Sequence, residues 1–352
     1  EFTMKCTIQN IADHLGLSRN TVSKALKNSS EVSENTRNLV IKTASKLGYK
    51  NATFATPVIP ASETGSNGTI LFLTRTYASD SEFWTTVLRG IESILSNANY
   101  HLAISIMSDS DLKQLNFPQT ISDSSIKGII LVEICDKVVC DALSQFNLPI
   151  VSVDMPNVPF EELNGIDVVT MESKKNLKKI INQLIEKGAE SFGFVGDLYS
   201  PNVSRGFQER YNALSECLAE HQLPLNQKNC LLHQTPEDFR NFQTTVNNLQ
   251  AMISLPDVFI CGNDWTAIQL IYALQFLGFQ IPKDICVVGF DNIPAASRIS
   301  PSLTTISTPQ KYLGIAAARQ ILERIQHPNC PHVFCQYETE LIIRNSTNII
   351  SF

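Results

Sequence analysis

Short apolar runs rich in β-branched and aromatic residues alternate with longer amphipathic runs over most of the chain. This alternation predicts parallel strands joined by helices that cover both faces of a sheet. The predicted strands outnumber those of one such sheet, so we expect two doubly wound lobes. The expected strands are 69–74, 101–107, 128–132, 149–153, 167–170, 192–196, 229–232, 258–261 and 285–290, and the expected helices are 83–98, 138–146, 174–187, 208–220, 239–253 and 266–277.

A different pattern precedes this alternation, in residues 4–50, which we call the head. Ile8, Ile11, Ala12 and Leu15 share one face of a predicted helix, with Thr7 as its N-cap. The spacing of the apolar positions therefore predicts a short helix that packs on one side only.

Two more helices follow in the head. Gly16 ends the first helix, Ser18 caps a second with Val22 and Ala25 inward, and a third begins at Ser33. Three short helices form one small core. A helix after a short turn that presents amides, hydroxyls and cations suits the major groove of DNA, and this helix presents Arg19, Asn20, Ser23, Lys24 and Lys27.

The charge is divided unevenly along the chain. Residues 1–50 hold eight Lys/Arg and four Asp/Glu, a net +4, whereas the whole chain is −6 and the remainder is therefore −10. A basic head on an acidic remainder favours a head that meets a polyanion, although a solvated helix surface would have the same charge. Between them, residues 51–67 are rich in small and turn-forming residues and form a linker.

Polar residues stand where several predicted strands of the body, residues 68–345, end. Ligands of open α/β sheets bind at these carboxyl ends. Asp154, Asn263 with Asp264, and Asp291 each follow a strand, and Arg210 lies in the helix after 192–196. Such groups suit a polyhydroxylated ligand, but each of them could also serve only to cap a helix. Aromatic side chains that would supply an apolar wall are Phe83, Trp84 and Trp265.

Motifs of other protein classes are missing. The chain has no nucleophile elbow, phosphate loop, dinucleotide fingerprint or His-Glu-x-x-His zinc motif, so we expect no catalytic residues and no cofactor. His327, Cys330, His332 and Cys335 are zinc donors in type, but their spacing favours a loop that leads into a strand, and we expect no metal. Nine cysteines in apolar stretches favour reduced thiols.

The head closely resembles the DNA-binding domain of the lactose repressor family of bacterial transcription regulators. The resemblance rests on Thr7–Ala12, Gly16–Leu26, Val32–Arg37 and Leu47–Tyr49. It implies that Arg19, Asn20 and Lys24 read bases, with Lys24 where the motif has Arg. The wider set that we expect to face DNA is Thr7, Ser18, Arg19, Asn20, Thr21, Ser23, Lys24, Ser33 and Thr36.

The body resembles the regulatory domain of the same family over 263–306 and 341–346. The resemblance implies a fold of the periplasmic-binding-protein type, with Asp154, Arg210, Asn263 and Asp291 on the effector. Ala213 stands where the family usually has Gly near the arginine. We therefore expect a cytoplasmic homodimer that regulates transcription. It would bind double-stranded operator DNA under the control of an effector that is a sugar or sugar phosphate. The alternatives are a sugar-binding or sugar-processing protein whose head has another role, and a periplasmic transport protein, which would have no use for the head.

The linker differs from that of the resembled family, whose members place a short helix and a Leu wedge in the minor groove here. Residues 51–58 lack that Leu and contain Pro57, which interrupts a helix. We predict that Phe54→Ala and Val58→Ala each leave operator affinity and DNA bending nearly unchanged in gel-shift and bending assays. If either variant loses both DNA bending and operator affinity, the substituted side chain acts as a minor-groove wedge and the prediction is wrong.

Overall fold

The structure is a computed structural model of the 352-residue chain. It describes residues 7–26, 32–33, 36–37, 39–40, 43–44, 66–75, 81–198, 204–233 and 241–348. Residues 1–65 and 66–352 form two compact units. Lys27, Leu47, Phe54 and Val58, which carry parts of the sequence analysis, lie outside the described residues.

The head contains helices α1 (Ile8–Leu15) and α2 (Arg19–Leu26). Thr7 caps α1 through the backbone N–H of Asn10, and Gly16 ends it in the left-handed region at φ 65°, as predicted. The small core of this unit consists of Ile11, Ala12, Val22, Ala25, Val32, Val40 and Ala44.

The N-terminal lobe of the body is built on a sheet of six strands in the order β11-β5-β4-β3-β1-β2, with every pairing parallel. Its elements are β1 (Gly68–Thr74), α4 (Glu82–Asn97), β2 (Tyr100–Ile106), α5 (Asp109–Gln114), η2 (Gln119–Ser122), β3 (Ile126–Val132), α6 (Lys137–Ser144), β4 (Ile150–Val153), η3 (Phe160–Glu162), β5 (Ile166–Met171), α11 (Gln310–Gln326) and β11 (Phe334–Tyr337).

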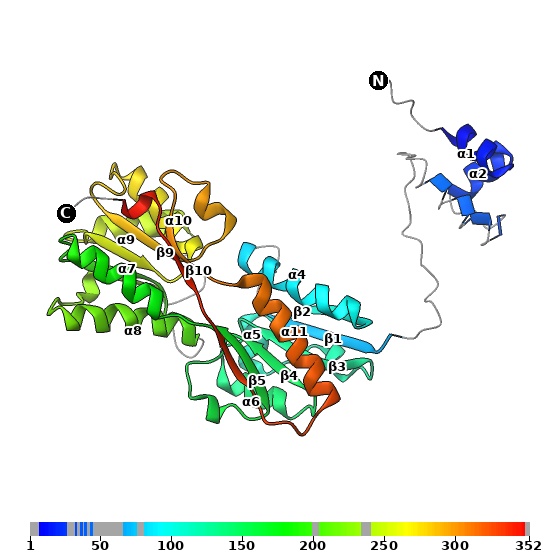
Figure 1. The fold of residues 1–352 in the computed structure, drawn as a ribbon, viewed down its shortest axis with the longest axis horizontal. Coiled ribbons are helices and arrows are strands. Elements are labelled where there is room, and N and C mark those ends of the chain that lie inside the picture. The colour runs from blue at the N-terminus through cyan, green and yellow to red at the C-terminus, as the bar shows by residue number, and fades with distance from the viewer. Residues whose placement is uncertain are drawn as a thin grey trace. The chain divides into compact units, whose positions relative to one another are not determined.

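Side chains alternate between two apolar layers along these strands. Ile70 and Phe72 face the layer that contains α4 and α11, whereas Leu71 and Leu73 face the layer that contains α5 and α6. Figure 1 shows α4 and α11 side by side over the sheet. The burial of both faces explains why the strands read as continuous apolar runs.

The C-terminal lobe repeats this plan with the strand order β12-β10-β9-β8-β6-β7. The predicted fold class is confirmed, with one addition: β12 runs antiparallel to β10 at the edge. The elements are α7 (Lys175–Glu186), β6 (Phe192–Asp197), α8 (Arg205–Glu220), η4 (Gln227–Asn229), β7 (Leu231–His233), α9 (Phe242–Ala251), β8 (Val258–Cys261), α10 (Asp264–Phe276), β9 (Cys286–Asp291), η5 (Pro294–Ser297), β10 (Thr304–Ser307), β12 (Glu340–Ile342) and η6 (Asn345–Thr347).

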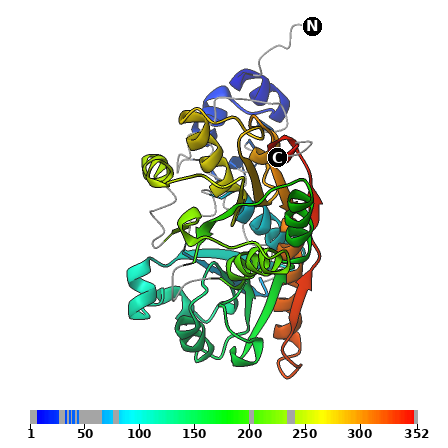
Figure 2. The ribbon, with the colours of Figure 1, turned by 90° about the vertical axis from the view of Figure 1, so that its left-hand side faces the viewer.

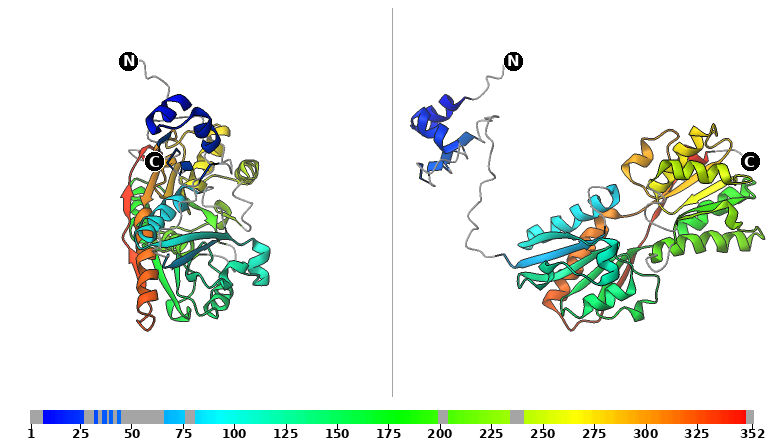
Figure 3. Two further views of the ribbon diagram at one scale, coloured as in Figure 1. Left: turned by 90° about the vertical axis from the view of Figure 1, so that its right-hand side faces the viewer. Right: turned by 180° about the vertical axis from the view of Figure 1, so that it is seen from behind.

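The chain passes between the lobes three times, after β5, after β10 and after β11. Figures 2 and 3 show α11 and β11 back in the N-terminal lobe after the chain has built most of the C-terminal one. Helices α5 and α11 and strands β10 and β12 were not predicted from the sequence. Within the described part of the chain, each helix is too short or too polar to span a bilayer.

Helices α4 and α11 approach closely because glycines meet at their crossing. A Cβ atom on Gly90 would collide with the backbone carbonyl of Lys311, and one on Gly314 with that of Val87. Any larger residue at either position would push the helices apart.

A buried ion pair fixes the end of α11. The Arg324 guanidinium donates from Nη2 to Asp167 Oδ1 at 2.8 Å and from Nε to Oδ2 at 3.0 Å. The side chains are 5% and 0% exposed. Gln320 Nε2 and the backbone N–H of Val333 donate to the same carboxylate. Although burial alone would raise the pKa of Asp167, these hydrogen bonds hold it below its ordinary value of 3.8.

We predict that Asp167→Asn and Arg324→Met each lower the free energy of unfolding by about 3–5 kcal/mol, because each leaves a buried charged or polar group unpaired. Urea denaturation at pH 7 measures the loss. Glu338→Gln removes an exposed ion pair to Lys175 and should cost under about 1 kcal/mol.

The pair should also make stability depend on pH. Because the folded pKa of Asp167 lies below 3.8, its contribution is complete above that pH and is lost as the pH falls through the folded pKa. Asp167→Asn should flatten this acid limb, and an unchanged limb would contradict the role given to the pair.

Candidate functional site

The second helix of the head presents polar groups on its first turn. Ser18 Oγ accepts from the backbone N–H of Thr21 at 3.0 Å, which caps α2 and leaves the next two side chains outside the turn. Arg19 and Asn20 are exposed, whereas Thr21, Ser23 and Lys24 are half-buried. This turn therefore offers a guanidinium and an amide to a partner.

The remaining residues expected to face DNA are caps. Thr7 Oγ1 bonds with Asn10 Oδ1 at 2.6 Å, and Ser33 Oγ lies 2.8 Å from Thr36 Oγ1. Thr7 and Ser33 are exposed and Thr36 is half-buried. These hydroxyls fix helix starts, whose backbone N–H groups attract anions such as phosphate.

In the body, the polar residues predicted to bind an effector come from both lobes. Asp154 follows β4 of the N-terminal lobe, whereas Asp291 ends β9 and Arg210 lies in α8 of the C-terminal lobe. Both aspartates adopt positive φ, 74° and 118°. Strained backbone of this kind persists only where the surroundings impose it.

Arg210 is the buried centre of this group. Its side chain is 4% exposed, its guanidinium lies 3.6 Å from the ring centroid of Phe290, and Nη1 donates to the carbonyl of Gly262 at 2.6 Å. Burial lowers the pKa of Arg210, and the charges of Asp291 and Asp154 oppose that shift. The structure thus brings Arg210 and both aspartates within electrostatic reach of one another.

The two aspartates are held by different contacts. Asp154 Oδ1 accepts from the backbone N–H of Met155 at 2.8 Å. The backbone carbonyl of Asp291 accepts from Nε2 of Gln310, the first residue of α11, at 2.6 Å and from Oγ1 of Thr308, just before that helix, at 3.1 Å. Burial raises the pKa of Asp154 and of Asp291, and Arg210 opposes the shift in each.

Asn263 and Asp264 have separate positions. Asn263 Oδ1 caps α10 by accepting from the backbone N–H of Thr266 at 2.9 Å. Asp264 is fully buried and accepts from Thr305 Oγ1 at 2.6 Å and from the Ile293 backbone at 2.9 Å. Burial raises the pKa of Asp264 to about 6. Asp264 therefore holds α10 to the strands behind the cleft.

The predicted aromatic wall is only partly accessible. Phe83 and Trp84, in the first turn of α4, are 7% and 8% exposed and stack edge to face at 4.5 Å. Trp265 is half-buried in the first turn of α10.

Glu133 was missed by the sequence analysis. It follows β3 directly and has a φ of 58°, and Trp84 Nε1 donates to its Oε1. Its charge acts on Asp291 of the other lobe. Glu133 could have been found in the same way as Asp154, because each is a carboxylate at the carboxyl end of a parallel strand.

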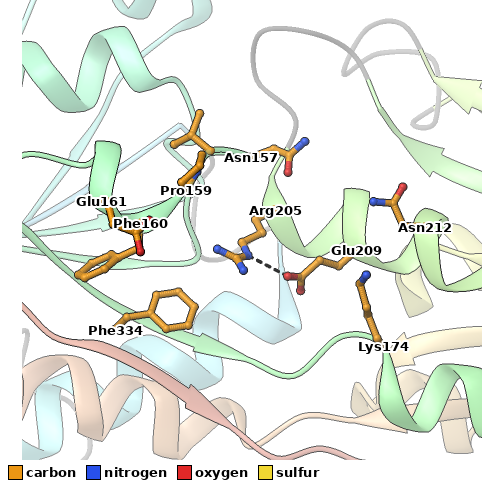
Figure 4. A pocket seen from close by; sticks show the side chains of 10 residues that line it. Asn157, Pro159, Phe160, Glu161, Lys174, Arg205, Glu209, Asn212 and Phe334 are labelled. Carbon is orange, nitrogen blue, oxygen red and sulfur yellow. Dashed lines mark hydrogen bonds and ion pairs between the residues drawn. The ribbon is translucent and has the colours of Figure 1, made fainter.

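The lobes also touch beside this group. The backbone N–H of Arg205 donates to the carbonyl of Met155 at 3.0 Å, and Glu82 Oε2 accepts from the backbone N–H of Ala295 at 3.2 Å. Next to the first contact opens a cavity of about 650 Å³, where Arg205 reaches between Phe334 and Glu209 (Figure 4). None of the seven predicted effector residues lines this cavity.

The His- and Cys-containing segment that leads into β11 supplies hydrogen-bond acceptors to Arg324. The carbonyls of Pro328, Cys330 and Pro331 accept from its guanidinium. His332 Nδ1 lies 3.4 Å from Asp167 Oδ1, and His327 lies 3.8 Å from Glu323. In the described ranges, no three His, Cys, Asp or Glu side chains gather in a way that could hold a metal ion.

Two family models match the chain. Residues 7–51 match "Bacterial regulatory proteins, lacI family", and residues 181–347 match "Periplasmic binding protein-like domain".

Full-length relatives have the same order of parts. The HTH-type transcriptional repressor PurR of Photobacterium profundum is 26% identical over 345 residues, 97% of this chain and 98% of that protein. The ribose operon repressor of Haemophilus influenzae is 27% identical over 344 residues, with the same shares covered. A solved lac repressor dimer bound to operator and the anti-inducer ONPF has a TM-score of 0.65 at 18% identity, covering 98% of this chain and 99% of that one.

The relatives match the head and the two-lobed body together, in one order and over nearly the whole length of both chains. The resemblance stated from the sequence is confirmed, and the protein belongs to the lacI family of bacterial regulatory proteins.

Proposed function

We propose that the protein is a repressor that binds a two-fold operator as a homodimer and is controlled by a sugar-type effector between its lobes. The observation that carries this proposal is the buried guanidinium of Arg210, which lies within electrostatic reach of carboxylates from both lobes in a chain that also has a helix-turn-helix head. Binding changes the occupancy of DNA and leaves the effector chemically unchanged, so the protein is no enzyme. It acts in the cytoplasm, where the operator is.

We assign the parts as residues 4–50 for DNA, 51–67 for the linker, and 68–345 for effector binding and dimerisation. In the body, hydroxyl groups of the effector would bond Asp154, Arg210, Asn263 and Asp291. Phe83, Trp84 and Trp265 would line its apolar face. The carboxylates accept from hydroxyls and the guanidinium donates to them, so a polyol satisfies both kinds of group.

A homodimer suits the operator because one head reads only a few base pairs. The body offers exposed apolar side chains for such contact, with Ile104 on edge strand β2 at 50% exposure and Phe276 on α10 at 68%.

The first prediction concerns base reading. Asn20→Ala should weaken binding to the cognate operator by about 1–3 kcal/mol and binding to random DNA very little, because an amide discriminates adenine through paired hydrogen bonds. Fluorescence anisotropy at fixed salt measures both. His14→Ala, exposed on α1, is the control. Equal losses on both DNAs would show that Asn20 touches only the backbone.

The second prediction concerns the effector. Asp291→Asn keeps a residue type that tolerates positive φ but removes the carboxylate. It should abolish the response of DNA binding to effector while leaving the affinity of the free protein for operator nearly unchanged. The test is operator binding with and without a sugar that acts on the wild type. Glu190→Gln, exposed on the same lobe, is the control, and a normal response in Asp291→Asn would mean that the site is elsewhere.

A further inference from the structure

The charges around Arg210 are unbalanced. The carboxylates whose charges act on its guanidinium are, in decreasing order of effect, those of Asp291, Asp154, Glu209 and Asp264. Asp291 in turn lies within reach of one cation, Arg210, and of three carboxylates, the third being that of Glu133. Among the described residues that act on Arg210 and Asp291, carboxylates therefore outnumber guanidinium groups.

Two further arginines, Arg205 and Arg75, already have carboxylate partners. Arg205 Nε donates to Glu209 at 2.8 Å, and Arg75 Nη2 donates to Asp109 at 2.6 Å. Arg210 is the cation that acts most strongly on both Asp154 and Asp291.

Arg210 itself has donor capacity left for a ligand. One nitrogen, Nη1, donates to the carbonyl of Gly262. Its Nε is buried and has no hydrogen-bond partner among the described residues. A buried donor without a partner costs free energy until something accepts from it.

Glu133 is fixed in its place. Trp84 Nε1 donates to one carboxylate oxygen, and the left-handed backbone, φ 58°, sets the direction of the side chain. Trp84 is in turn buried against Phe83, so the carboxylate has a rigid support.

We infer that this cleft takes an uncharged or amine-bearing polyol and rejects its phosphorylated and carboxylated forms, with Glu133 as a specificity-determining residue. This inference rests on the proposed function. A phosphate or carboxylate on the ligand would meet three carboxylates and one guanidinium, whereas hydroxyls donate to the first and accept from the second.

Matched ligand sets test the inference on the full-length protein. Calorimetric titration compares ribose with ribose 5-phosphate, and glucose with glucose 6-phosphate, glucuronate and glucosamine. In each set that binds, we expect the neutral sugar or the amine to bind at least about tenfold more tightly than the anion.

Charge-removing variants identify the residue responsible. Glu133→Gln should shrink the gap between neutral and anionic forms at least about threefold, because one repelling carboxylate is gone. Glu323→Gln removes a carboxylate that is 56% exposed on α11 and should leave the gap unchanged. Equal gaps in all three proteins would overturn the role of Glu133.

The outcomes separate this inference from the function on which it rests. An anionic sugar that binds more tightly than its neutral form, and loses affinity in Asp291→Asn, overturns the charge preference and keeps the site. If the Asp291→Asn variant binds the sugar as tightly as the wild type does, the proposed effector site is wrong. Failure of every sugar in every form to bind overturns the sugar-type effector and the inference together.

Discussion

A carboxylate that is completely out of water governs the construction of the body. Asp167 receives hydrogen bonds from α11, through Arg324 and Gln320, and from the backbone just before β11. Because an unpaired buried charge is very costly, β5, α11 and β11 come together as a group. Helix α11 then packs on α4 through Gly90 and Gly314, and α4 carries Trp84 to the cleft, where its indole fixes Glu133.

The cleft has the opposite balance. Asp167 is surrounded by donors, whereas Arg210 is one guanidinium among several carboxylates, stacked on Phe290 and only partly hydrogen-bonded. The hydrogen bonds of Asp167 are complete and stabilise the fold. Arg210 can still donate hydrogen bonds to a ligand. Asp291 connects the two, because its backbone carbonyl is held by Gln310 at the start of α11. A ligand on Asp291 therefore acts next to the passage that joins the lobes.

Much of this architecture was predictable from sequence because its signals are local. Thr7 and Gly16 fix the ends of α1. Strands that are buried on both faces, such as β3 and β8, can be recognised in the sequence as apolar runs. Helix α11 was missed although it is long. Its partners, Asp167 and Gly90, lie far back in the sequence, so no local pattern reveals why it is needed. Asp264 shows the limit of the strand-end signal: it follows a strand as Asp154 does, but its contacts are internal.

The three passages between the lobes set the order in which the protein can be finished. The head consists of the first residues, whereas the N-terminal lobe lacks α11 and β11 until residues 310–337 exist. Domains generally fold in order of synthesis, from the N-terminus. On the ribosome the helix-turn-helix is thus complete long before either lobe, and the lobe that begins first is closed last. A chain released early would keep a finished head attached to a body that has no means of answering a ligand.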